Sequence, residues 1–285
     1  MKRPVEIQKE VVGMQTLTEL TSVFEGIASM RIAQIKNQVM QSQNFFDRLW
    51  QMYSQMRAGS IFNFGRHTMK GEEVIEKELF VVITSEGGFS GEIDQKLITW
   101  MLNNYDKEKN DIVVIGHHGA MQLAQRGVGF KKYYKLPAKD QNINVTPIIR
   151  ESQKYRSTMV YYQTYVSLAV QDVKRISLQS AVEDQGKSVK DGEEIINEST
   201  YIFEPSIFAV VDHLERSMMT IALSQVILES KLAQYASRFQ AMTASHKRAN
   251  DTLSDLKLQV NRAKRAIKDE RLKEIINGMR KASHT

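Results

Sequence analysis

The chain has 285 residues, of which 42% are apolar, enough to bury the core of one large domain or two small ones. It contains no cysteine, which excludes disulfide bonds and thiolate zinc sites, and its six histidines show no spacing that predicts a metal site. The formal net charge of +6 favours acidic partners without choosing among nucleic acid, lipid and protein.

Neither a membrane-spanning segment nor a secretory signal is predicted. No apolar run approaches the roughly 18 residues that a transmembrane helix needs. The charged start at residues 1–6 lacks the apolar stretch of a signal peptide. We therefore expect a cytoplasmic protein that does not itself insert into a membrane.

The first predicted element is a long helix over residues 5–58. This segment contains no proline, and most steps between its apolar residues are three or four positions. Its glycines, Gly13 and Gly26, each weaken the helix propensity by about 1 kcal/mol relative to alanine. The apolar positions are Ile7, Val11, Met14, Leu17, Leu20, Phe24, Ile27, Met30, Val39, Phe46, Leu49 and Met52.

The middle of the chain alternates between strand and helix patterns. In chain order we expect a strand at 79–84, a helix at 93–105, a strand at 112–116, a helix at 120–125, a strand at 130–136, a helix at 151–173, a strand at 175–182 and an exposed loop at 182–194. Alternation of strands and helices implies a mainly parallel sheet, so the predicted fold class is α/β with a central Rossmann-like domain.

The last predicted element is a second long helix, over residues 206–285, which contain no proline and only one glycine, Gly278. Some 70 helical residues would span on the order of 100 Å, so the helix needs a partner to bury its apolar stripe. The natural partner is the N-terminal helix in an antiparallel coiled coil. The stripe does not show clean heptads, which favours an irregular coiled coil over a simple zipper.

Three sequence features are candidate sites for chemistry or binding. The glycine-rich segment at 85–91 leaves a strand and enters a helix, as phosphate loops do, but it lacks the spacing of known nucleotide motifs and is interpreted as a tight turn. His117 and His118 follow the next strand, with no partner assignable from the sequence. The basic residues of the last helix are interleaved with acids, which opposes DNA binding and favours a solvated or protein-contacting face.

Several motifs together resemble the gamma subunit of F-type ATP synthases over nearly the whole chain. Residues 236–242 read A-S-R-F-Q-A-M and are similar to the A-A-R-M-x-A-M of that family. Residues 261–265 and 272–278 resemble its N-K-A-R-Q and L-T-E-I-x-x-G motifs, and residues 201–205 resemble its Y-x-x-E-P. Residues 84–91 are similar to T-S-D-R-G-L-C-G-G, and the segment around Leu20, Ile27 and Gln34 resembles the N-terminal motif.

The resemblance implies a non-catalytic rotor shaft that couples rotation to ATP synthesis or hydrolysis in alpha and beta subunits. It also implies an epsilon-type subunit and a membrane c-ring as partners, no cofactor, no nucleic acid, and a place beside the inner face of the cell membrane. Arg238, Arg265 and Asp269 would meet the catch loop of a beta subunit, and Tyr201 and Glu204 would lie near the rotor ring. The packing positions of the shaft would be Leu20, Phe24, Ile27, Phe239 and Met242.

We expect the chain to be divided into an N-terminal shaft helix at 1–68, a central α/β domain at 72–200 and a C-terminal shaft helix at 205–285. Departures from the family pattern occur at Phe24 and Gly26, at residues 246–248, and at Arg265 and Asp269. They leave open a divergent paralogue that serves a specialised, motility-linked ATPase. A coiled-coil scaffold or adaptor and a nucleotide-using α/β enzyme remain alternatives.

Overall fold

The computed structural model describes residues 3–57, 75–136, 143–178, 204 and 206–282. Its elements are α1 (Pro4–Arg57), β1 (Ile75–Ile83), α2 (Ile93–Leu102), β2 (Asn110–Ile115), α3 (His117–Gln125), β3 (Lys132–Tyr134), α4 (Thr146–Ser152), β4 (Tyr155–Tyr165), β5 (Gln171–Ser177) and α6 (Ile207–Ala282). The two long terminal helices and the elements predicted between residues 79 and 136 are confirmed. The loop predicted at 182–194 lies outside the described residues.

The chain divides into two compact units. The first, here called the helix-pair unit, combines residues 1–27 with residues 239–285. The second, the α/β unit, comprises residues 28–238 and contains all the strands found among the described residues. Both α1 and α6 contribute to each unit, so the two units are described in turn.

The sheet of the α/β unit has the strand order β3-β2-β1-β4-β5. β1 pairs in parallel with β2 and with β4, β2 pairs in parallel with β3, and β4 pairs antiparallel with β5. The central strand β1 is continuously buried over Leu79–Ile83, as expected for a parallel strand that is covered on both faces. The mainly parallel sheet predicted from the sequence is therefore confirmed.

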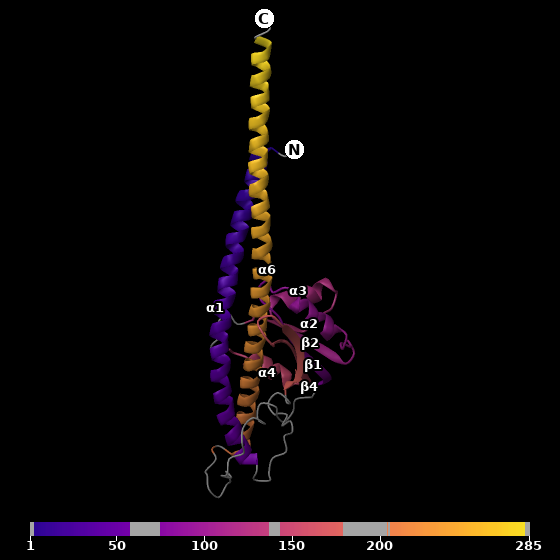
Figure 1. The fold of residues 1–285 in the computed structure, drawn as a ribbon. Helices are drawn as coiled ribbons and strands as arrows, with labels where there is room; N and C mark the ends of the chain where they lie inside the picture. Colours follow the sequence, from indigo (N-terminus) through magenta and orange to yellow (C-terminus); the bar gives the residue numbers. More distant parts are fainter. Residues whose placement is uncertain (1–2, 58–74, 137–142, 179–203, 205, 283–285) are drawn as a thin grey trace. The chain divides into compact units, whose positions relative to one another are not determined.

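Each face of the sheet carries its own hydrophobic core. On one face, Leu223 and Ile227 of α6 pack with strand residues that include Val81. On the other face, Leu97 of α2 and Leu123 of α3 pack with residues that include Phe80 and Val82. Figure 1 shows α6 passing one side of the sheet. Burial of each such side chain stabilises the unit by about 1.5–3 kcal/mol, so α6 is an integral part of the α/β core.

The helix predicted over residues 151–173 is wrong. Only the short α4 reaches Ser152, and the segment continues as β4 and β5, with β5 beginning at Gln171. The sequence of β4, Y-R-S-T-M-V-Y-Y-Q-T-Y, is rich in aromatic and β-branched residues that fit a pleated sheet. Val160 and Tyr162 belong to one core and Tyr161 to the other. Because β4 is buried on both faces, its sequence lacks the alternation of apolar and polar residues that marks a strand.

In the helix-pair unit, α1 and α6 run antiparallel. Ile7 and Val11 near the start of α1 pack with Leu253, Leu256 and Val260, which lie far along α6. By contrast, the Thr243 hydroxyl, near the start of this part of α6, donates to the Glu25 carboxylate at 2.7 Å, late in this part of α1. The antiparallel pairing predicted from the sequence is confirmed in this unit.

The contact seam of the helix-pair unit is a regular heptad. The buried and half-buried positions of α1 in this unit are Pro4, Ile7, Val11, Met14, Thr18, Thr21 and Glu25. Those of α6 from His246 onward are His246, Ala249, Leu253, Leu256, Val260 and Ala263. Steps of three and four alternate in both helices, as in a coiled coil. Within this unit the seam is thus more regular than the apolar stripe of the sequence, because polar residues occupy part of it.

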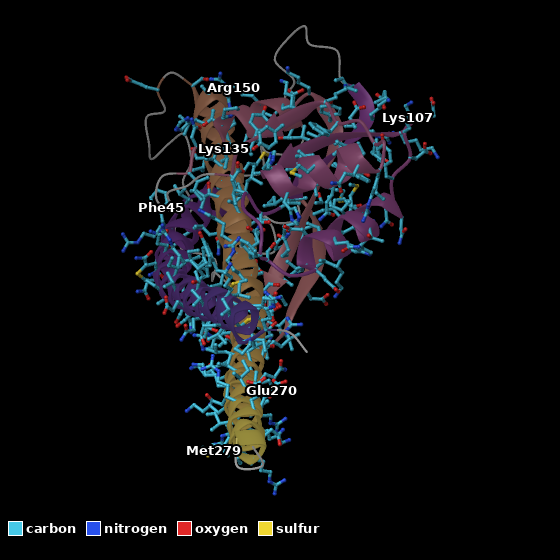
Figure 2. All side chains as sticks on the ribbon, turned by 90° about the horizontal axis from the view of Figure 1, so that it is seen from above. Phe45, Lys107, Lys135, Arg150, Glu270 and Met279 are labelled. Atoms are coloured by element: carbon cyan, nitrogen blue, oxygen red, sulfur yellow. The ribbon has the colours of Figure 1, made fainter. Side chains whose placement is uncertain are left out.

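Beyond the seam, α6 continues with residues 264–280, all of which are exposed. Figure 2 shows Glu270 and Met279 along this part of the helix, with side chains on all its sides. Met279 is 65% exposed and Leu272 is 60% exposed. Among the described residues, no helix is both long enough and apolar enough to cross a membrane.

Candidate functional site

The candidate site lies at the carboxyl ends of β1, β2 and β4, where the loop 84–92 leads into α2 and Gly116 leads into α3. Gly116 has φ +100°, and a Cβ there would lie 2.1 Å from the Thr84 carbonyl oxygen. The Thr84 hydroxyl accepts a hydrogen bond from the Gly119 amide at 3.0 Å. Glycines at these two positions therefore let the start of α3 approach the end of β1 closely.

Asp94, in the first turn of α2, is the centre of a buried polar network. Its carboxylate is fully buried and accepts hydrogen bonds from the Ser85 hydroxyl and from the Ser85 amide, the latter at 3.4 Å. It also accepts from the Ser90 hydroxyl at 3.3 Å and from the Gln163 amide nitrogen at 2.6 Å. The fifth partner is the His118 ring, with Nδ1 2.7 Å from Asp94 Oδ2. A buried carboxylate needs such donors to offset its desolvation.

The network continues into α6. The Gln163 Oε1 atom accepts hydrogen bonds from the Ser230 hydroxyl and from the Gln234 amide nitrogen, the latter at 3.3 Å. One turn later, the Ser237 hydroxyl donates to the Ser90 carbonyl oxygen at 2.6 Å. These α6 side chains are buried. The α/β domain is thus attached to α6 by directional polar contacts in addition to the apolar core.

Arg238 of α6 binds the loop 87–88 at the end of this network. Its guanidinium donates to the carbonyl oxygens of Gly88 and Gly87, at 3.2 and 3.4 Å, and lies 5.0 Å from the centre of the Tyr235 ring. Burial lowers the pKa of the guanidinium, while Tyr235 and Asp94 act in the opposite direction. Arginine stays protonated throughout the physiological range, so the loop carbonyls face a fixed positive charge.

The contacts at this edge fit a structural network better than a catalytic one. Both Ser85 and Ser90 donate their hydroxyls to Asp94, so the serine, histidine and aspartate are not arranged as nucleophile, base and orienting acid. The Glu86 carboxylate accepts from the His117 amide at 3.3 Å and from the Tyr133 hydroxyl at 3.1 Å. In the described ranges, no three potential metal-ligating acids and histidines gather together.

The residues predicted to contact partners are placed as follows. Arg238 belongs to α6, is half-buried, and contacts the loop 87–88 within the α/β unit. Arg265 and Asp269 lie four positions apart on one face of the exposed end of α6, in the helix-pair unit. Glu204 is exposed, just before α6 begins. Tyr201 lies outside the described residues.

The five predicted packing positions fall into two groups. Met242 is 5% exposed, and Phe239 is half-buried. Leu20, Phe24 and Ile27 are instead 50%, 39% and 43% exposed. In this structure these three side chains are therefore largely exposed, and their role as packing positions of the shaft stays a prediction. They lie one position from the seam, because polar Thr21 and Glu25 occupy the positions that face α6.

Sequence reasoning missed Asp94, Gln163 and the α6 side chains that bind Gln163. One signal was present, since Ser230, Gln234 and Ser237 are polar residues at helical spacing inside a stretch of α6 that is otherwise strongly buried. Polar groups on a buried helix face require partners. The sequence did not show where those partners were.

Comparison with known proteins extends over almost the entire chain. The family described as ATP synthase matches residues 5–281. The chain belongs to the ATP synthase gamma family. A gamma chain from Chlorobium phaeobacteroides (strain BS1) is 24% identical over 96% of both chains. The gamma chain from Staphylococcus aureus (strain Newman) has the same identity and the same coverage of both chains.

Solved structures show the same fold as this gamma family member. The rotor of the Euglena gracilis mitochondrial ATP synthase superposes with a TM-score of 0.62 at 13% identity, covering 93% of this chain and 98% of that one. A second structure of that enzyme, with the F1 part and the c-ring, gives a TM-score of 0.65 at 15% identity, with 97% and 93% coverage. A five-stranded sheet flanked by long terminal helices is thus the fold of this family, and the predicted fold class is confirmed.

Proposed function

We propose that this chain is the central rotor shaft of an F-type rotary ATPase or ATP synthase, and that it couples rotation to nucleotide chemistry in alpha and beta subunits. The observation that carries the proposal is the family match over residues 5–281, which includes both long helices as well as the α/β domain. A scaffold protein would need only the helices, and an α/β enzyme would need only the sheet.

The exposed apolar residues of the helix-pair unit support a partner around the shaft. Leu17, Leu20, Phe24 and Ile27 follow one another at steps of three or four on α1, and each is between 39% and 50% exposed. On α6, Leu272, Ile275 and Met279 are more than half exposed. Apolar stripes of this kind mark protein contact surfaces. We assign both stripes to contact with the alpha and beta subunits of the head.

We assign the contact with the beta catch loop to Arg238, Arg265 and Asp269, and the side near the rotor ring to Glu204 and Tyr201. Arg238 already binds the carbonyl oxygens of loop 87–88, so the loop holds its guanidinium in a fixed orientation for such a contact. We also propose the domain division of 1–68, 72–200 and 205–285. Further partners are an epsilon-type subunit and the c-ring, which would hold the complex at the inner face of the membrane.

In this role the chain is not catalytic. A shaft acts on the beta subunits by making different contacts with each of them, and only such differences shift the populations of their conformations. Because α6 is part of the α/β core and also extends through the helix pair, rotation of the α/β domain would be transmitted through one continuous helix. The departures from the family pattern, which include Phe24, Arg265 and Asp269, leave open a specialised paralogue, and the test below distinguishes it.

Native mass spectrometry of the tagged protein from its own cells tests the proposal, with ATPase activity assayed on the same sample. We expect one copy of this chain with three alpha-like and three beta-like chains, together with ATPase activity. The identity of the copurifying subunits separates the main ATP synthase from a motility-linked ATPase. A monomer or homodimer without these partners under gentle conditions would overturn the shaft assignment and favour the scaffold.

Ending the chain before Arg238 separates the shaft contacts from the fold. The α/β unit keeps its core residues Leu223, Val226 and Ile227, so it should remain folded by circular dichroism. Coupling of ATP hydrolysis to ion transport should be strongly reduced, because all of α6 from Arg238 onward is missing. Full coupled turnover by this truncated chain would refute the contacts proposed for the helix-pair unit.

A further inference from the structure

The imidazole of His118 lies at one end of the Asp94 network and reaches the surface. Its Nδ1 atom is 2.7 Å from Asp94 Oδ2, and its side chain is 32% exposed while that of Asp94 is 0% exposed. The other protein groups that contact this carboxylate are hydrogen-bond donors, from Ser85, Ser90 and Gln163. The carboxylate is therefore an acceptor, and Nδ1 of His118 carries a proton.

The opposite ring nitrogen also has a candidate acceptor. His118 Nε2 lies 3.5 Å from the side-chain amide of Gln122, one turn later in α3. Among the described residues, the buried Gln122 Oε1 atom has no hydrogen-bond partner in its present orientation. A half-turn of this amide exchanges its oxygen and nitrogen and points Oε1 at Nε2. Both N–H groups of an imidazolium would then have acceptors, whereas in the present orientation a neutral ring accepts from the Gln122 amide nitrogen through Nε2.

The His118 ring is connected to α6 through Asp94, whereas the His118 backbone amide separately donates to the Ser85 carbonyl oxygen at 3.0 Å. The Asp94 carboxylate binds Gln163, which accepts from Ser230 and Gln234 of α6. It also binds Ser90, whose carbonyl oxygen accepts from Ser237 of α6. A change in charge on His118 therefore alters the electrostatics of the one carboxylate that both routes share. Hydrogen bonds between charged partners are roughly twice as strong as neutral ones.

We propose that His118 is a proton-responsive clamp between the α/β domain and α6. In its protonated form it fixes the Asp94 carboxylate, which holds Gln163 and the loop 85–91 in the positions that bind α6. Loss of the Nε2 proton keeps the hydrogen bond from Nδ1 to Asp94 but removes the positive charge beside this buried carboxylate, and the attachment of the loop loosens. The clamp goes beyond the proposed rotor role and does not depend on it.

The charged groups around the clamp come from α2, from the loop after β1 and from α6. Asp94 is contributed by α2, and Glu86, from the loop after β1, accepts a hydrogen bond from the backbone amide of the neighbouring His117 in α3. Arg238 of α6 interacts electrostatically with Asp94. The hydrogen bond to Asp94 raises the pKa of His118, although burial opposes this in part. Negative charge next to the ring thus favours its protonated form.

The direction of the pH dependence follows from that raised pKa. Protonated His118 contributes stability that is fully present below the pKa of an unfolded histidine, about 6.5. This contribution is lost as the pH rises through the higher pKa of the folded state. Attachment of loop 85–91 to α6 should therefore be tighter in mildly acidic than in mildly alkaline solution.

The test uses the full chain and combines NMR titration of the histidine rings with hydrogen exchange of the backbone amides between pH 5.5 and 8.5. We expect the His118 ring to titrate above 6.5. The Ser85 amide, which donates to Asp94, should exchange faster as the pH rises, after correction for the intrinsic pH dependence. The change should approach tenfold for each unit by which the folded pKa exceeds the unfolded one.

Two variants and a matched control make the test specific. His118→Gln should abolish the pH dependence of Ser85 exchange, whereas His117→Gln, at the adjacent histidine, should preserve it. Gln122→Glu leaves Asp94 untouched and places a carboxylate beside Nε2, so it should move the transition to higher pH. A His118 ring that titrates at or below 6.5, an unchanged pH dependence in His118→Gln, or no shift in Gln122→Glu would each overturn the proposal.

Discussion

The guanidinium of Arg238 donates a hydrogen bond to the carbonyl oxygen of Gly88 at 3.2 Å, across 150 positions of sequence. Arg238, which the family resemblance assigns to a partner contact, therefore also holds the loop 87–88 of the same chain in place. Its two roles predict two separable effects of mutation.

Arg238→Ala should lower the free energy of unfolding of the α/β unit by about 1 kcal/mol, because it removes hydrogen bonds from a half-buried charged donor. Thermal unfolding of the isolated chain measures this effect. Arg238→Lys keeps the charge but not the planar fork, so it should recover only part of the stability. If the stability of Arg238→Ala equals that of the unmodified chain, the contact with loop 87–88 contributes nothing to the fold.

Leu253→Ala should destabilise the helix-pair unit by about 2–4 kcal/mol, because Leu253 is 7% exposed and packs with Ile7 and Val11. The control is Leu258→Ala, since Leu258 is 55% exposed on the same helix and should change stability by less than about 0.5 kcal/mol. Helix content followed by circular dichroism during denaturation gives both values. Equal effects of the two substitutions would contradict the heptad seam.

His246, Thr18 and Thr21 form a polar layer in the seam, and this layer should make the helix pair less stable than an apolar one would. His246 Nδ1 lies 3.1 Å from the Thr18 carbonyl oxygen and 3.4 Å from the Thr21 hydroxyl, where a coiled coil would usually place apolar residues. We expect His246→Leu to stabilise the helix pair by about 1 kcal/mol while weakening the register that the polar layer specifies.

Chemical denaturation checks the stability, and Lys247→Leu, one position away and exposed, is the control for adding a leucine to the helix. A loss of stability in His246→Leu that is absent from Lys247→Leu would show that the histidine contacts stabilise the pair.

Gly116→Ala should destabilise the α/β unit by about 3 kcal/mol or more, because the added Cβ would lie 2.1 Å from the Thr84 carbonyl oxygen and the residue has φ +100°. Gly129→Ala is the matched control, since a Cβ there meets no atom within 4 Å. The melting temperatures of the two variants measure the difference. Similar melting temperatures would mean that β1 and α3 can move apart at little cost.

The sequence alone determined which segments form helices or strands wherever the local pattern favoured only one of the two. The absence of proline from residues 5–58 and 206–285 marked both long helices, and β-branched runs marked β1 and β2. Signals of this kind are local, because they depend on the backbone chemistry of each residue and on the spacing of apolar side chains. The family motifs, which are also local patterns, were sufficient to indicate the gamma family.

The tertiary structure decided which face each side chain presents. β4 is buried on both faces, so its pattern lost the alternation of a strand and was mistaken for a helix. In α1, the partner helix selected the face containing Thr18, Thr21 and Glu25, and left the more apolar Leu20, Phe24 and Ile27 exposed. The Asp94 network joins residues from α2, α3, β4 and α6, and no pattern along the sequence encodes contacts that arise only when distant segments pack together.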